Sequence, residues 1–305
     1  MKRRLFQIGT LVVSNSYVGS LFFNNIYQGW FKGVCIPVMN CYGCPLAMVS
    51  CPIGTLQHFV IIKAFPLMLV GFLGIIGLTV GRMTCGWLCP FGFFQEMLYK
   101  VNTRKFFPGK AWSCSKYLVL LGLTLLVAFW VGEPWFCKLC PVGTLEAGIP
   151  IVAWNPGGDI FTEGGSIVSR VGTLFYVKLS ILFALVAAAV LVHQPFCRYA
   201  CPLGAIWSLF NKLSLFRLKV RTEACTFFED CHQGCPMDVN VHQDANDGDC
   251  IRCLECTKWK CKMVKFGPIW SEDRTDSKPQ PLDPEITRAL KELRERERQE
   301  HDHRH

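Results

Sequence analysis

The chain has 305 residues, of which 51% are hydrophobic, and its mean hydropathy is +0.27. This composition excludes a large soluble enzyme of several domains and predicts an integral membrane unit with one small soluble domain. The net charge of +9 comes largely from basic residues beside the apolar blocks, so it does not require a nucleic acid partner.

Four apolar blocks predict four membrane-spanning helices, because a span needs roughly 17–25 residues. The first block follows a basic start and carries a polar run, Ser14 to Ser16, which would face the bundle interior or line a site. No small-residue cleavage site follows convincingly, so we interpret this block as a retained span and not as a signal peptide. The predicted spans are Leu5–Phe23, Phe59–Val80, Lys116–Val131 and Gly172–Val192.

Lysine and arginine assign the two sides of the membrane. They are abundant in the N-terminus, between the second and third spans, and after the fourth span, and scarce in the other two connections. By the positive-inside rule, the N-terminus, the second connection and the C-terminal module are cytoplasmic. The pattern therefore predicts a multi-pass protein of the cytoplasmic (inner) membrane.

The 18 cysteines stand mostly in short clusters, often directly before proline. Thiolates two or three residues apart can ligate one metal centre together, which is why iron–sulfur ligation is the favoured interpretation. Disulfides remain the alternative for cysteines on the outer face.

An internal repeat relates the two halves of the membrane region. Cys51-Pro-Ile-Gly-Thr-Leu-Gln matches Cys140-Pro-Val-Gly-Thr-Leu-Glu, and Cys85-Gly-Trp-Leu-Cys89-Pro-Phe-Gly matches Cys197-Arg-Tyr-Ala-Cys201-Pro-Leu-Gly. Repeats of this kind commonly pack around a pseudo-two-fold axis, which brings equivalent motifs together. Proline fixes φ and glycine permits close backbone approach, so each motif can turn amides toward sulfur. A plain helix-end turn is the alternative.

One span separates the two motif types, so they are expected on opposite faces of the membrane. The metal-ligating cysteines expected on the cytoplasmic face are Cys85, Cys89, Cys197 and Cys201, with Cys114 nearby. Those expected on the opposite face are Cys35, Cys41, Cys44, Cys51, Cys137 and Cys140, enough for one four-cysteine centre or for two disulfides. A gap approaching the hydrocarbon thickness of about 30 Å would then remain between the faces. We expect His58 and His193 to be interfacial and not haem ligands, so a quinone is the candidate to bridge that gap.

The C-terminal module, residues 221–270, carries the most specific signal. Cys235, Cys250, Cys253 and Cys256 have the spacing of one [4Fe–4S] centre, in which the Cys-Pro cysteine is the crossed ligand. A zinc ribbon is the alternative. The second centre keeps only Cys225, Cys231 and Cys261, with Phe228 where a cysteine is expected, so it is a three-iron cluster or has a non-cysteine ligand.

The predicted fold is therefore a mostly α membrane protein with a small ferredoxin-like α+β module. Residues 1–220 form four transmembrane helices in two repeated halves, residues 221–270 form the bicluster module, and residues 271–305 form a charged helical tail. We expect no catalytic residues in the chain itself, since no catalytic triad or nucleotide fold is visible.

These motifs resemble the NapH family of membrane ferredoxin-type quinol dehydrogenase subunits and the membrane–ferredoxin portion of NosR-like proteins. The resemblance covers residues 1–265, and the extra cysteine group from Cys35 to Cys51 indicates a related subfamily. It implies a subunit that passes electrons between the quinone pool, [4Fe–4S] clusters and a redox protein such as a cytochrome, a ferredoxin or a reductase. Two other functions stay open: a redox-linked assembly or maturation factor for a metalloenzyme, and a structural zinc or disulfide protein.

Overall fold

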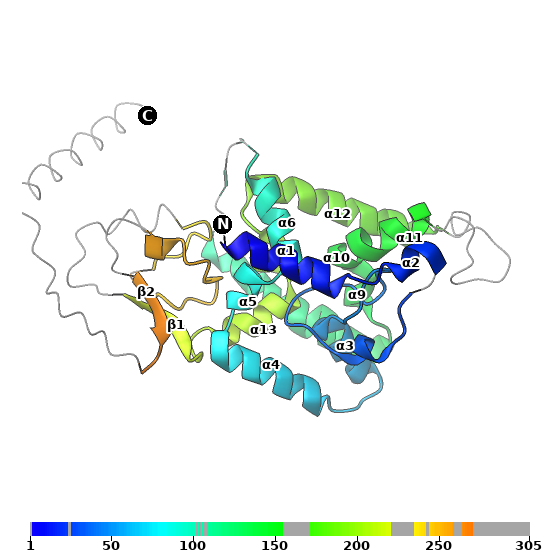
Figure 1. Cartoon of the computed structure of the whole chain (residues 1–305), viewed down its shortest axis with the longest axis horizontal. Helices are drawn as coiled ribbons and strands as arrows, with labels where there is room; N and C mark the ends of the chain where they lie inside the picture. The colour runs from blue at the N-terminus through cyan, green and yellow to red at the C-terminus, as the bar shows by residue number, and fades with distance from the viewer. Residues whose placement is uncertain are drawn as a thin grey trace, which may run out of the picture.

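The computed structural model describes residues 2–23, 26–101, 103, 105–106, 109–154, 171–220, 235–241, 244–258 and 264–270. Three of the predicted ligands, Cys225, Cys231 and Cys261, and the predicted charged tail lie outside these ranges. The described part is mostly helical, as predicted (Figure 1).

The helices of the first half are α1 (Lys2–Ser14), α2 (Gly19–Phe23), α3 (Pro52–Ile61), α4 (Leu67–Val80), α5 (Met83–Trp87) and α6 (Pro90–Tyr99). The next stretch runs from α7 (Ser115–Leu118) through π-helical turns at Val119–Leu126 into α8 (Val127–Val131). The second half holds α9 (Trp135–Leu139), α10 (Pro141–Gly143), α11 (Ile149–Trp154), α12 (Thr173–Leu191) and α13 (Pro202–Phe210). The strands are β1 (Phe216–Val220) and β2 (Val264–Pro268).

Two helices within the described ranges are long and apolar enough to cross a membrane: Trp112–Val131 and Thr173–Leu191. They coincide with the third and fourth predicted spans. Large apolar side chains point outward from both, with Leu118, Trp130 and Phe183 at least 75% exposed. Apolar surface of this extent suits contact with lipid.

The first two predicted spans are each divided. α1 ends at Ser14, whose hydroxyl donates to the carbonyl of Thr10 at 2.6 Å. Such a side-chain hydrogen bond competes with the backbone hydrogen bonds that would continue the helix. The second block is split between α3 and α4 by a turn in which Lys63 has a φ of 55° and Pro66 offers no amide hydrogen. The pieces are shorter than the roughly 17 residues of an ordinary span.

Four of the described helices begin at the proline of a Cys-Pro pair: α3, α6, α10 and α13. Proline is favoured in the first helical turn because its missing amide hydrogen would be unsatisfied there anyway. α6 packs along α12, α10 also contacts α12, and α3 packs against both α8 and α13. The repeated motifs therefore start helices inside one buried core, which also contains Ile53 and Trp207.

β1 and β2 pair antiparallel, with Phe216 opposite Pro268 and Val220 opposite Val264. The pair lies at one end of the molecule, beyond α13 (Figure 1). The loop that carries Cys250 packs between this pair and the helices: the amide of Asn246 bonds to Leu218, and Asn211 donates to the carbonyl of Cys250 at 2.8 Å.

Candidate metal centres

The structure brings together four buried cysteines, which we name the first thiol group: Cys85, Cys89, Cys197 and Cys201. Burial raises the pKa of each thiol, and the neighbouring Cys85 raises the pKa of the other three further. Four adjacent thiolates would repel one another strongly unless cations neutralised them. Cys114, which was expected nearby, is exposed.

In the two Cys-Pro-x-Gly motifs of the first thiol group, the glycine donates its amide to the cysteine three residues before it. Gly92 donates to the Cys89 sulfur at 3.4 Å, and Gly204 donates to the Cys201 sulfur at 3.3 Å. A Cβ atom at Gly204 would lie 2.9 Å from the carbonyl oxygen of Cys197, too close for any other residue. Glycine is therefore needed at position 204 because the backbone there lies against the carbonyl of Cys197.

Replacing Gly204 with alanine is expected to lower the free energy of unfolding by about 1–3 kcal/mol, the usual cost of overpacking. Thermal unfolding of the purified protein in detergent measures this. Gly71→Ala in α4 is the matched control, because a Cβ there meets nothing within 4 Å. Equal stabilities of the two variants would contradict the close approach at Gly204.

Several buried hydrogen-bond donors point at the first thiol group. Gln95, which is 1% exposed, donates to the Cys197 sulfur at 3.3 Å. The side chains of Arg82 and Thr84 both donate toward the Cys85 thiol and oppose the burial that raises its pKa. Buried donors directed at sulfur suit the ligand of a cluster.

Four cysteines from the expected outer-face set form a second thiol group: Cys41, Cys51, Cys137 and Cys140. Burial raises the pKa of Cys41 and of Cys137 to about 12, and Cys51 adds to both shifts. Cys44 stands beside Cys41, whereas the Cys35 sulfur faces the hydroxyl of Thr55 at 3.4 Å. None of the described cysteines is joined in a disulfide.

In three of the four Cys-Pro-x-Gly motifs, the residue six positions after the cysteine is polar. Its side-chain oxygen accepts a hydrogen bond from the backbone of another cysteine-containing segment. Gln57 accepts from the amide of Cys137 at 3.2 Å, and Glu146 accepts from the amide of Cys41 at 2.6 Å. Gln95 accepts from the amide of Phe196 at 3.0 Å. These residues occupy the same position of the repeat. Their shared position is visible in the sequence, but the sequence alone does not indicate this role.

The predicted gap between the two thiol groups, close to the thickness of a membrane, is wrong. Cys51 of the second group is close enough to Cys201 of the first to raise the pKa of the Cys201 thiol, though less than burial, Cys85 and Cys89 do. α3, which Cys51 precedes, packs against α13, which Cys201 precedes. The Cys-Pro helices meet because the cysteine before each of them lies in one buried core.

In the third, C-terminal thiol group, Cys235 lies beside the loop that carries Cys250 and Cys253. Cys256 is half-buried at the short turn Cys256–Lys258 and packs against the same core. Arg252 and Leu254, which flank Cys253, have φ values of 50° and 61°. The loop therefore contains left-handed residues on both sides of this cysteine. Backbone of this kind forms a concave nest of amides that suits an anionic cluster.

The C-terminal loop is docked on the first thiol group by buried polar contacts. Asp249 accepts from Lys116 at 2.6 Å, from Ser113 at 2.5 Å and from Arg82 at 3.3 Å. Arg82 also donates to the carbonyl of Cys197, so its guanidinium connects the C-terminal loop to the first thiol group.

The donor sets fit iron–sulfur clusters. Within the described ranges, no three histidine, cysteine, aspartate or glutamate side chains stand close enough to hold a single metal ion. A [4Fe–4S] cluster instead spreads four thiolate ligands over four irons. The first two thiol groups each supply four cysteines, and the third supplies Cys235, Cys250 and Cys253, with Cys256 at the turn that follows.

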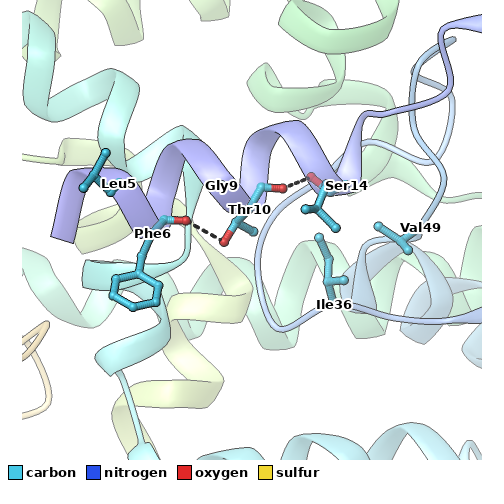
Figure 2. A pocket seen from close by; sticks show the side chains of 8 residues that line it. Leu5, Phe6, Gly9, Thr10, Ser14, Ile36 and Val49 are labelled. Atoms are coloured by element: carbon cyan, nitrogen blue, oxygen red, sulfur yellow. Dashed lines mark hydrogen bonds between the residues drawn. The ribbon is translucent and has the colours of Figure 1, made fainter. Parts of the chain in front are cut away.

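An apolar pocket of about 570 Å³ runs along α1 (Figure 2). Leu5, Phe6 and Val13 line it from the helix, and Ile36 and Val49 line it from the loop. The hydroxyls of Thr10 and Ser14 donate to carbonyls of their own helix, which leaves the pocket few free donors.

Comparison with known proteins gives the chain a family context. A family model described as a 4Fe-4S binding domain matches residues 61–112, 117–149 and 174–222. The uncharacterized protein MJ0750 of Methanocaldococcus jannaschii is 29% identical over 70% of this chain and 83% of its own. The putative electron transport protein YccM of Escherichia coli is 24% identical over 63% of this chain and 52% of its own. A regulatory protein NosR of Pseudomonas aeruginosa is 31% identical over 31% of this chain and 95% of its own.

No solved structure matches the chain. Since the chain spans only about half of YccM, the relatives' whole-protein activities do not transfer directly.

Proposed function

This chain belongs to the NapH- and NosR-like family of membrane iron–sulfur electron-transport proteins, and we propose that it passes electrons between the quinone pool and a redox partner protein. The observation that carries the proposal is that three groups of cysteines pack around one buried core. When bound, [4Fe–4S] clusters supply one-electron transfer. We place the chain in a membrane, because two of its described helices are long and apolar enough to span one.

We assign one cluster site to each thiol group: Cys85, Cys89, Cys197 and Cys201; Cys41, Cys51, Cys137 and Cys140; and Cys235, Cys250, Cys253 and Cys256. Cys35 and Cys44 are then spare. Cys225, Cys231 and Cys261, outside the described residues, would hold a further centre completed by a non-cysteine ligand or lacking one iron. The N-terminus and the C-terminal module are assigned to the cytoplasmic side of the inner membrane by the positive-inside rule.

The residues around the thiols have definite roles in this proposal. The amides of Gly92 and Gly204 and the side chain of Gln95 donate to sulfur, which stabilises negative charge there. Arg82 adds a buried positive charge. The hydrogen bonds and the positive charge favour the reduced form and so raise the reduction potential. The apolar core excludes water from the sulfurs, which acts in the opposite direction.

The quinone is assigned to the pocket along α1, because a membrane quinone needs an apolar site and Leu5, Phe6 and Val13 provide one. The pocket lies on the first predicted span, where a polar run first suggested a quinone site. The redox partner is a cytochrome, a ferredoxin-type protein or a reductase subunit.

Iron and sulfide analysis tests the proposal directly. Protein purified without oxygen is expected to contain at least about 12 irons per chain, from four irons in each of three groups. A quinol analogue is expected to reduce part of this iron, as followed by EPR. A colourless, iron-free sample would overturn the proposal, and so would clusters that stay oxidised over the whole quinone potential range.

Deletion of the protein in cells separates the proposal from an assembly role. An electron-transfer subunit leaves its partner enzyme fully metallated and starved of electrons. A partner enzyme that is present but lacks its metal would indicate an assembly factor.

A further inference from the structure

We propose that the first and second thiol groups form one continuous electron path through the core of the membrane domain, joined at Met39. The inference rests on the proposed function, because both groups must hold clusters. It goes further in placing the extra N-terminal cysteine segment directly against the repeated Cys-x-x-x-Cys-Pro motifs, so that no separate carrier is needed between them.

Met39 touches both groups. Its thioether sulfur lies 3.7 Å from the Cys51 sulfur, and its backbone amide bonds to the thiol of Cys89. The side chain is 4% exposed. A single residue therefore contacts a ligand of each group, with no solvent between them.

The helices bring the groups together independently of Met39. α3 starts at Pro52 and packs against α13, which starts at Pro202. Cys51, Cys89, Cys140 and Cys201 belong to one contiguous buried cluster of side chains. The rate of electron tunnelling falls steeply with distance. Because the two groups lie in one buried cluster, direct electron transfer between them is the favoured route.

Buried polar contacts hold the segment that carries Met39 in place. Asn40, fully buried, donates to the carbonyl of Val49 at 3.3 Å and accepts from Asn15 of the first helical region at 3.0 Å. The amide of Ile36 donates to Ser50 at 3.2 Å, and the buried ammonium of Lys32 donates to the carbonyl of Ala47 at 2.9 Å. The segment is therefore a fixed part of the core and not a surface loop.

The redox step is the transfer of one electron. Iron at one thiol group is oxidised by one electron, iron at the other is reduced by one, and no bond is formed or broken. The quinol or the C-terminal centre supplies the electron at the first group, and an oxidised redox protein removes it from the second. The reverse direction uses the same contact when the potentials of donor and acceptor are reversed.

EPR of the wild-type protein tests the contact without any substitution. The potential is lowered stepwise with a mediator, and the line shape and power saturation of each cluster signal are followed. Two adjacent paramagnetic clusters are expected to split or broaden each other's signals, and the splitting should appear only when both are reduced. Two clusters that are both reduced but magnetically independent would overturn the inference while leaving the proposed function intact.

Two variants sharpen the test. Cys140→Ser should remove the second centre, leaving the first signal unsplit with about four irons fewer, by the four-iron stoichiometry. Cys114→Ser is the matched control, because Cys114 is exposed and outside all three groups, and it should leave iron and splitting unchanged. If Cys140→Ser lost no iron, or if mass analysis of the wild type showed Cys51 or Cys140 in a disulfide, the second centre and the path would both be refuted. Absence of all iron from the wild type would instead refute the proposed function itself.

Discussion

Replacing Arg82 with glutamine is expected to destabilise the protein by about 3–5 kcal/mol, the usual cost of removing one partner from a buried ion pair. Arg82 is 0% exposed and donates to Asp249 at 3.3 Å and to the carbonyl of Gly248 at 2.6 Å. It also donates to the carbonyl of Cys197. The substitution would leave Lys116 as the nearest cation to Asp249. It would also deprive the carbonyls of Gly248 and Cys197 of their hydrogen-bond donor.

Thermal or denaturant unfolding in detergent measures the loss at Arg82. Lys212→Gln is the control, because Lys212 pairs with Asp244 at 3.0 Å while the two side chains are 68% and 38% exposed. An exposed pair of this kind contributes only about 0–1 kcal/mol. Arg82→Lys should recover little stability, since an ammonium cannot reproduce the fork of a guanidinium.

The charge of Arg82 gives a second, independent readout. Its guanidinium lies beside Cys85, Cys197 and Cys201, so its removal should lower the reduction potential of the centre at the first thiol group. Lys212→Gln should leave that potential unchanged. A loss of stability without any change in potential would show that Arg82 has a structural role only.

Replacing Gly86 with alanine is expected to push the C-terminal loop away from the first thiol group. A Cβ atom at Gly86 would lie only 2.4 Å from the carbonyl oxygen of Ile251, and backbone cannot move aside as a flexible side chain can. Trp87 donates to the carbonyl of Arg252 at 3.0 Å, so the same displacement would break this bond too. Overpacking of this kind costs about 1–3 kcal/mol.

Hydrogen exchange and limited proteolysis report on the loop directly. In Gly86→Ala, the amides of residues 244–258 should exchange faster and protease should cut there sooner, with the helices unaffected. Gly74→Ala in α4 is the matched control, since a Cβ at Gly74 meets nothing within 4 Å. Protection that is the same in both variants would refute the close contact between Gly86 and Ile251.

The proposed iron–sulfur chemistry follows from the sequence alone. Candidate thiolate ligands come in short runs along the chain, so their spacing marks Cys250 and Cys253, and likewise the motifs of Cys89 and Cys201. The repeat also indicated that equivalent motifs lie together, and the structure brings them together. Long apolar stretches identified Trp112–Val131 and Thr173–Leu191, because a continuous helix needs only local information.

The packing of the core fixes which cysteines share a group and how the groups are joined. Cys41 stands with Cys51, whereas Cys35 faces Thr55, a choice that loop packing makes and spacing does not. Arg82 and Asp249 are 167 residues apart in the chain, so nothing local marks them as partners. The same holds for Met39, whose contacts depend on Cys-Pro helices that begin in the interior. Buried contacts between distant segments follow from how the core packs, and no short pattern in the sequence encodes that packing.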